Sequence, residues 1–194
     1  MSGHDHSMIH PQQLPDARYK KGVMRLFITA LSAFILVACA SYSGTDLKPG
    51  EARLEDVLRI MGDPAMRWQD SDGSRQLAYP RGIHTFMVQI GSDGKMQGIE
   101  NVMGMKTFAR IRPGMTKSQV LRIMGPSEPS ATAYFKARDE LVWEWRYCDA
   151  WNEPARFDVL FDGSKEIVRS TMSLTESQMG LCGREGGCLC AHAK

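Results

Sequence analysis

The chain has 194 residues, enough for one or two small domains, with 24 basic and 22 acidic residues and a formal net charge of +2. Four of these basic and two of these acidic residues precede residue 39, which leaves 20 of each in the rest of the chain. A chain so evenly charged lacks the basic surface that nucleic-acid binding requires, so we expect no nucleic-acid partner.

Residues 1–38 are predicted to be a lipoprotein signal peptide. A basic segment starting at Lys20 precedes an apolar run, residues 26–38, that is too short to span a bilayer securely. The run ends in Leu-Val-Ala and is followed by Cys39. This is the lipobox pattern of bacterial lipoproteins, in which the cysteine is acylated and becomes the new N-terminus. An uncleaved anchor helix is the alternative. The start is unusually long, and Met24 is an alternative initiator.

The residue after Cys39 is Ala40 rather than aspartate. By the sorting rule known for enterobacterial lipoproteins, this resembles a passenger sent to the outer membrane. We therefore expect a chain anchored by a covalent lipid on Cys39 at the periplasmic face of the outer membrane, with no other cofactor. Residues 39–48 are small and polar and are predicted to form a flexible tether.

Residues 49–103 are predicted to form a first α+β repeat. Apolar residues from Leu54 to Met61 follow the i, i+3, i+4, i+7 spacing of an amphipathic helix, although Arg53 at its start cannot complete a capping box. Three antiparallel strands are predicted to follow, at residues 75–80, 84–90 and 95–102.

Residues 104–174 are predicted to form a second repeat of the same kind. Thr116 is a good N-cap, and Gln119 is placed to complete a capping box. Gly125 is expected to end the helix in a left-handed conformation, and Pro126 forbids its continuation. A helical turn is predicted before this helix and three strands after it, at residues 105–109, 140–147, 155–161 and 166–172.

The string VLRIMG occurs at residues 57–62 and again at 120–125, and a Pro-Gly pair precedes each copy. The two strings are 63 residues apart and the two pairs 64. We interpret this as a tandem repeat. The predicted fold is therefore α+β, with two repeats of a helix followed by a three-stranded antiparallel meander. Because a short helix covers only one side of a sheet, each sheet should keep one face available for a partner.

The stretch IRPGMTKSQVLRIMGP at residues 111–126, with the strand WEWRY and a later strand ending in FDG, resembles the SmpA/OmlA family. That family includes the BamE-type lipoprotein of the outer-membrane β-barrel assembly machinery. The resemblance covers residues 105–172 well and 47–102 loosely. A tandem pair of such units also resembles the β-lactamase inhibitor protein fold. We transfer no site residues, because the family's binding residues lie outside this motif.

Catalysis has little support in the sequence. His84 is the one histidine of residues 49–174, and it alternates with Phe86 and Val88, which favours a packed or strand-end position over an acid–base role. Residues 70–74 resemble a calcium loop only in part, since the required later glycine and glutamate are missing. Phosphate-binding and nucleophile motifs are absent from the sequence, so we expect neither an enzyme nor a metal site.

Aromatic residues offer a candidate contact site. Trp143 and Trp145 share one face of their predicted strand with Leu141 and Tyr147, and Glu144 and Arg146 lie on the other face, so we expect both tryptophans to face the core. Trp151 lies in a predicted loop outside any such period, so we select it as the candidate partner contact.

Four cysteines follow Cys39, and two disulfides are expected in an oxidising periplasm, with three possible connectivities. Cys188 and Cys190 are too close in sequence to pair readily, so one of them should reach Cys182 and the other Cys148. A metal site formed in the tail, residues 175–194, is the rival interpretation, with Cys182, Cys188, Cys190 and His192 as its ligands.

The leading functional hypothesis is a protein-binding accessory in outer-membrane β-barrel assembly or envelope integrity. One alternative is an inhibitor of a periplasmic hydrolase, as the inhibitor-like tandem implies. A second alternative is a metal or redox module that works through the Cys-rich tail.

Overall fold

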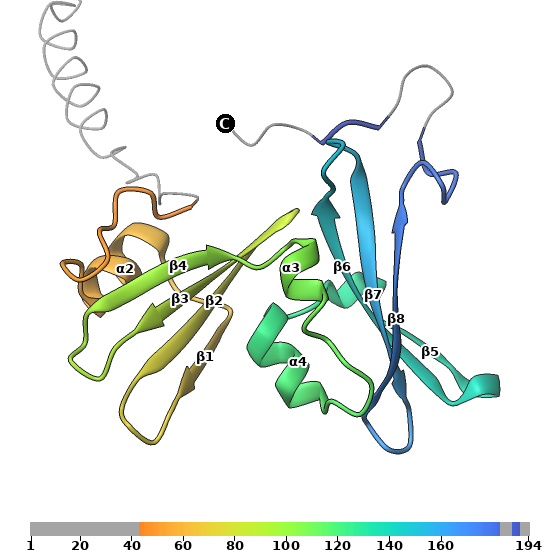
Figure 1. The fold of residues 1–194 in the computed structure, drawn as a ribbon, viewed down its shortest axis with the longest axis horizontal. Helices are drawn as coiled ribbons and strands as arrows, with labels where there is room; N and C mark the ends of the chain where they lie inside the picture. The colour runs from red at the N-terminus through yellow and green to blue at the C-terminus, as the bar shows by residue number, and fades with distance from the viewer. Residues whose placement is uncertain (1–42, 183–187, 191–194) are drawn as a thin grey trace, which may run out of the picture. The chain divides into compact units, whose positions relative to one another are not determined.

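A computed structural model describes residues 43–182 and 188–190 (Figure 1). The chain divides into two compact units, residues 1–39 and 40–194, and all described residues belong to the second. The predicted signal peptide, Cys39 and Ala40 lie outside the described residues. Among those described, no helix is long and apolar enough to cross a membrane.

The described unit has an α+β fold with two four-stranded antiparallel sheets, in the strand orders β1-β2-β3-β4 and β5-β6-β7-β8 (Figure 1). The helices are α2 (Leu54–Met61), α3 (Met105–Phe108) and α4 (Lys117–Met124), with 3-10 turns η1 (Pro129–Ala131) and η2 (Lys136–Arg138). The first sheet contains β1 (Met66–Gln69), β2 (Arg75–Arg81), β3 (His84–Ile90) and β4 (Met96–Asn101). The second sheet contains β5 (Ala133–Phe135), β6 (Glu140–Cys148), β7 (Pro154–Asp162) and β8 (Val168–Thr175).

The predicted three-stranded meanders are wrong, because each sheet has a fourth strand at its start. The missed strands are β1 and β5, with four and three residues. Such short edge strands do not contain enough residues for an apolar–polar alternation to be recognised. The six predicted strands are present, although β8 begins at Val168 and continues to Thr175, beyond the predicted end at Met172.

Helix α4 begins as its sequence predicts. The Thr116 hydroxyl accepts the Gln119 backbone N–H at 3.3 Å, and the Gln119 side chain accepts the Thr116 backbone N–H at 2.9 Å. Met115 and Val120, on either side of this cap, pack in the same core cluster. The capping box and its apolar support are therefore confirmed.

Helix α2 begins with half of such a box. The Asp56 carboxylate accepts the Arg53 backbone N–H at 3.0 Å. The guanidinium of Arg53 has no lone pair to return the bond. The sequence prediction missed this contribution of Asp56, since it considered only the residue at the N-cap.

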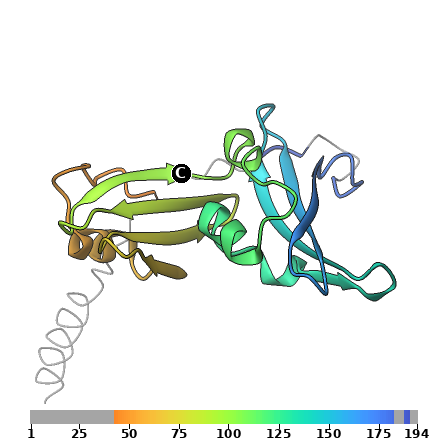
Figure 2. The ribbon, with the colours of Figure 1, turned by 60° about the horizontal axis from the view of Figure 1, so that its bottom comes forward.

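Helix α2 covers one face of the first sheet (Figure 2). Val57 and Met61 of the helix pack against Leu77 and Val88 of the strands. Leu47 is buried in the same cluster, although it falls in the predicted tether. The packed part of the chain therefore begins before residue 49.

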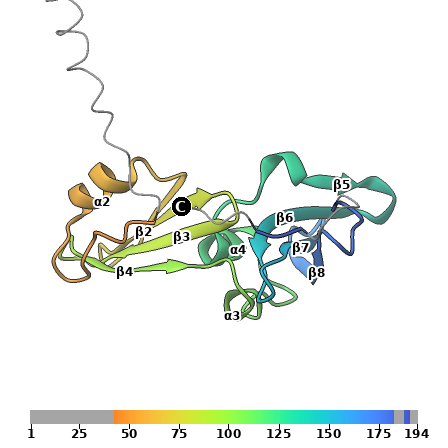
Figure 3. The ribbon, with the colours of Figure 1, turned by 90° about the horizontal axis from the view of Figure 1, so that it is seen from above.

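Helix α4 packs against both sheets (Figure 3). Val120 and Met124 share one core cluster with Ala78 and Met87 of the first sheet and with a group of residues from the second. The members from the second sheet include Trp145, Tyr147, Phe157, Val159 and Phe161. The prediction that each sheet keeps one face free is therefore wrong for the first sheet, because α2 packs on one of its faces and α4 on the other.

Candidate functional site

The candidate contact residue Trp151 lies in the loop between β6 and β7, and its side chain is 84% exposed. The loop is held from within by Asp149, whose carboxylate accepts the backbone N–H groups of Trp151 and Glu153 at 2.8 and 2.9 Å. The Asp149 backbone N–H also donates to the Glu153 carbonyl at 2.9 Å. Trp151 is therefore presented to solvent by an ordered loop.

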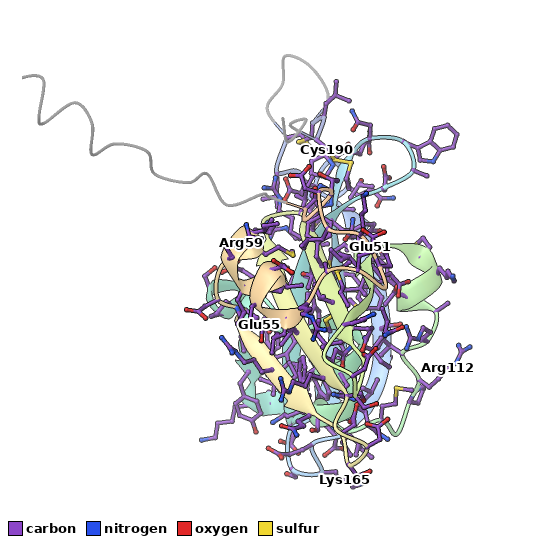
Figure 4. All side chains as sticks on the ribbon, turned by 90° about the vertical axis from the view of Figure 1, so that its left-hand side faces the viewer. Glu51, Glu55, Arg59, Arg112, Lys165 and Cys190 are labelled. Atoms are coloured by element: carbon purple, nitrogen blue, oxygen red, sulfur yellow. A yellow bond between two sulfur atoms is a disulfide. The ribbon has the colours of Figure 1, made fainter. Side chains whose placement is uncertain are left out.

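Two disulfides bring the described part of the tail to this loop. Cys148 is bonded to Cys190, and Cys182 to Cys188. One member of the 188/190 pair thus reaches Cys182 and the other reaches Cys148. The Cys190 backbone N–H donates to the Asn152 carbonyl at 2.9 Å, beside the disulfide in which Cys190 takes part (Figure 4).

The tail adds further exposed apolar side chains to this end of the second sheet. Leu189 is 68% exposed, Leu181 54% and Met179 39%. Together with Trp151 they form what we call the tip surface. Large apolar side chains exposed in a group, on backbone held by disulfides, are typical of a binding surface rather than of ordinary solvent-facing loops.

The two disulfides leave no free thiol on Cys148, Cys182, Cys188 or Cys190 for a metal site. A cysteine binds metal as a thiolate, and a sulfur in a disulfide is not one. Among the described residues, no group of three or more His, Cys, Asp or Glu is arranged to hold a metal ion. His192, the fourth ligand of the hypothetical site, lies outside the described residues.

Charged side chains cluster on the outer face of the second sheet, away from α4. Arg146 donates to both carboxylate oxygens of Glu176, at 2.7 and 2.8 Å. Arg156, on the neighbouring strand, donates to Glu144 and to Glu176. The bond from Arg146 holds the pKa of the Glu176 carboxyl below its usual range. These residues of β6 and β7, with Glu176 directly after β8, form an ion-pair network that we call the outer network.

Asp158 lies in the same outer network and is 8% exposed. Among the described residues, none donates a hydrogen bond to its Oδ1 atom. Burial raises the pKa of Asp158 from 3.8 to about 6, and the charge of Glu144 raises it as well, whereas Arg156 lowers it. With Asp158 included, the network holds three carboxylates against two guanidinium groups, so it has an excess of negative charge.

The structure places His84 at the first residue of β3. Its Nδ1 atom lies 2.9 Å from Nδ2 of Asn101, and its ring contacts that of Phe86. The Oδ1 atom of Asn101 already accepts from the Thr85 and Met103 backbone N–H groups, so Nδ2 faces the histidine and donates to it. Burial lowers the pKa of His84, which favours the neutral ring that this acceptor role requires.

The acidic residues of the partial calcium loop have other partners. Both oxygens of Asp70 accept from Arg122 of α4 at 2.8 Å. The Asp72 carboxylate accepts the backbone N–H and the hydroxyl of Ser74, which is a turn contact. Asp70 therefore links the β1–β2 turn to α4.

No protein-family model matches the chain, and comparison with curated proteins and with solved structures also gave no match.

Sequence reasoning missed the outer network and the apolar tail residues of the tip surface. A signal for the first is present in the sequence. Glu144 and Arg146 are two residues apart on one predicted strand, and Arg156 and Asp158 on the next, so each pair shares one strand face. In the structure Arg146 lies opposite Arg156, and Glu144 opposite Asp158. Like charges opposite one another destabilise a sheet unless a third group compensates, and here Glu176 does so for the arginines.

Proposed function

We propose that the chain is an envelope lipoprotein that binds a protein partner through the tip surface. The observation that carries this proposal is the exposure of Trp151, Leu181 and Leu189 on backbone that two disulfides hold together. Tryptophan dominates many binding hot spots, because a large rigid ring loses little conformational entropy when it is buried by a partner.

The charge around the tip surface favours a protein over a lipid surface. Asp149 and Glu153 flank it, while the described residues of segments 149–153, 176–182 and 188–190 include no lysine or arginine. Carboxylates repel the anionic headgroups that attract peripheral proteins to membranes. A partner protein with an apolar pocket has no such conflict.

The envelope location rests on two observations. The sequence of residues 1–39 has the pattern of a lipoprotein leader ending at Cys39, with a lipid as the membrane anchor. The two disulfides fit an oxidising compartment such as the periplasm. We infer that the chain lies at the periplasmic face of the outer membrane.

We also infer that the two α+β halves are copies of one unit. The Gly50 N–H donates to the Met96 carbonyl at 2.7 Å, and the Gly114 N–H donates to the Val168 carbonyl at 2.8 Å. In each case the glycine of the Pro-Gly pair bonds the first residue of the last strand of its sheet. This correspondence adds to the repeated VLRIMG string and supports a tandem relative of the SmpA/OmlA units, with a role in β-barrel assembly or envelope integrity.

The test is capture of partners from detergent-solubilised outer membrane with the full chain and with Trp151→Ala. We expect the substitution to reduce capture at least about tenfold, as for a hot-spot residue, with an unchanged melting temperature. Met105→Ala is the matched control, because Met105 is 66% exposed but lies on α3. The proposal fails if both variants capture the same proteins as the parent chain, or if Trp151→Ala unfolds it.

A further inference from the structure

Strand β6 has an edge that its neighbour covers only in part. β5 pairs with Glu140, Leu141 and Val142, whereas β6 continues to Cys148. Beyond β5, the Glu128 N–H donates to the Glu144 carbonyl at 3.0 Å. From there to Cys148, this edge of β6 has no strand partner among the described residues.

The backbone of Arg146 is directed toward this edge. In an antiparallel sheet, successive residues turn their N–H and C=O groups alternately to the two sides. Because the Glu144 carbonyl bonds Glu128 on the edge side, the backbone groups of Arg146 also point there. A residue of an added antiparallel strand could therefore exchange two hydrogen bonds with Arg146.

Hollows lie on both sides of this edge. The inner one has a volume of about 420 Å³, and its wall includes Ala65, Pro80, Met103 and Trp145. The outer one has a volume of about 440 Å³, and its wall includes Ser130, Ala131, Glu144 and Arg156. Gly82, Glu128 and Arg146 line both hollows, so the two are continuous across the edge. We call this feature the β6-edge groove.

The two sides of the groove differ in chemistry. The inner side is largely apolar, with Pro80, Met103 and Trp145. On the outer side the Arg146 guanidinium is turned across the sheet to Glu176, on the far side of β7.

Carboxylates predominate near the groove. Arg156 is paired with Glu144, whereas Glu128 is exposed, lines both hollows and has no arginine or lysine partner among the described residues. With Glu128, the outer network contains four carboxylates and two guanidinium groups, which is a net charge of −2.

We propose that the β6-edge groove binds an extended segment of a partner protein, which adds to β6 as an antiparallel strand. The segment carries a basic residue opposite Arg146, with an apolar residue on either side of it. The basic side chain then faces Glu128, and its apolar neighbours face the hollow beside Trp145. This site is separate from the tip surface and does not depend on it.

The probe is the capped tetrapeptide Thr-Val-Lys-Val, titrated into the full chain in mild detergent. Its threonine lies opposite Cys148, and the peptide ends before the position opposite Glu144, which Glu128 occupies. We expect saturable binding, with slower hydrogen exchange at the Arg146 amide. A methyl group on the lysine backbone nitrogen removes one of the two bonds with Arg146 and should weaken binding at least about tenfold. A methyl on a valine nitrogen points away from β6 in this register and is the matched control.

Two substitutions in the protein test the side-chain contacts. Ala65→Trp fills the inner hollow from an exposed position and should weaken binding at least about tenfold, while Ala137→Trp, on exposed η2, should not. Glu128→Lys should reverse the preference of the groove from the lysine peptide to its glutamate counterpart. Trp151→Ala should leave peptide affinity unchanged, so that failure of the tip surface and failure of the groove are distinguished.

The proposal is overturned by any of three results: no binding of the tetrapeptide, equal binding of the two methylated peptides, or unchanged affinity in Ala65→Trp.

Discussion

Substitution of the two glycines that end α2 and α4 offers a direct measure of how α4 is packed. Gly62 and Gly125 close the same VLRIMG string and have nearly the same backbone, with φ of 79° and 73° and ψ of −164° and −173°. Their surroundings differ. A Cβ atom on Gly62 would meet nothing within 4 Å, whereas one on Gly125 would lie 2.9 Å from the Thr85 methyl and 3.4 Å from the Ala78 Cβ.

Both alanine substitutions strain the backbone, but only Gly125→Ala also overpacks its surroundings. At this φ and ψ a residue with a Cβ is strained, which costs about 1–3 kcal/mol at either position. Overpacking adds about 1–3 kcal/mol at Gly125 alone, since Thr85 is buried and has little room to move. We therefore expect Gly62→Ala to lower the free energy of unfolding by about 1–3 kcal/mol and Gly125→Ala by about 2–6 kcal/mol.

The measurement is urea unfolding followed by tryptophan fluorescence, with Thr85→Ser as the second substitution of a double-mutant cycle. Serine lacks the methyl group that the new Cβ would meet, so it should recover about 1 kcal/mol in Gly125→Ala and nothing in Gly62→Ala. Equal losses at the two glycines, with no coupling to Thr85, would refute the close packing of α4 on the first sheet.

Three further predictions address the anchor, the helix caps and the outer network. Cys39→Ser should release the chain from the membrane fraction and abolish labelling with palmitate; retained label and membrane fractionation would rule out Cys39 as the lipid attachment site. Thr116→Ala should destabilise by about 1 kcal/mol in urea melts, and Arg53→Ala by much less, because the side chain of Arg53 accepts no capping bond; equal losses would contradict the assigned helix starts. The folded pKa of Asp158, about 6, is above its usual 3.8, so the unpaired carboxylate lowers stability increasingly as pH rises from about 4 to 6. Asp158→Asn should thus be neutral near pH 4 and stabilise by as much as about 3 kcal/mol above pH 7; the same effect at both pH values would show that charge is not the cause.

Local patterns were sufficient to predict much of the fold. The cap at Thr116 and the glycine at residue 125 define the limits of α4, because both act through backbone groups within one turn. The alternation of Trp143, Trp145 and Tyr147 identified the inner face of β6, since side chains of a strand alternate between two faces. The conformation of Gly125 was predicted less well: its φ is positive, but ψ is extended rather than left-handed.

The short strands and the charged network could not be predicted in the same way. Strand β5 has three residues, and its existence depends on pairing with β6, which local propensity does not determine. The outer network depends on Glu176 reaching Arg146, thirty residues away in sequence. The low exposure of Asp158 is also a result of this assembly.

The sequence by itself determined the helix limits, most of the strands, the α+β class and the exposure of Trp151 in a loop, because these depend on neighbouring residues. Only the tertiary structure decided that α4 packs against both sheets and that the edge of β6 beyond β5 has no strand partner among the described residues. It also brought the apolar tail residues beside Trp151. These features arise from contacts between segments far apart in the chain, and burial and backbone pairing at such distances depend on the complete packing rather than on any local pattern.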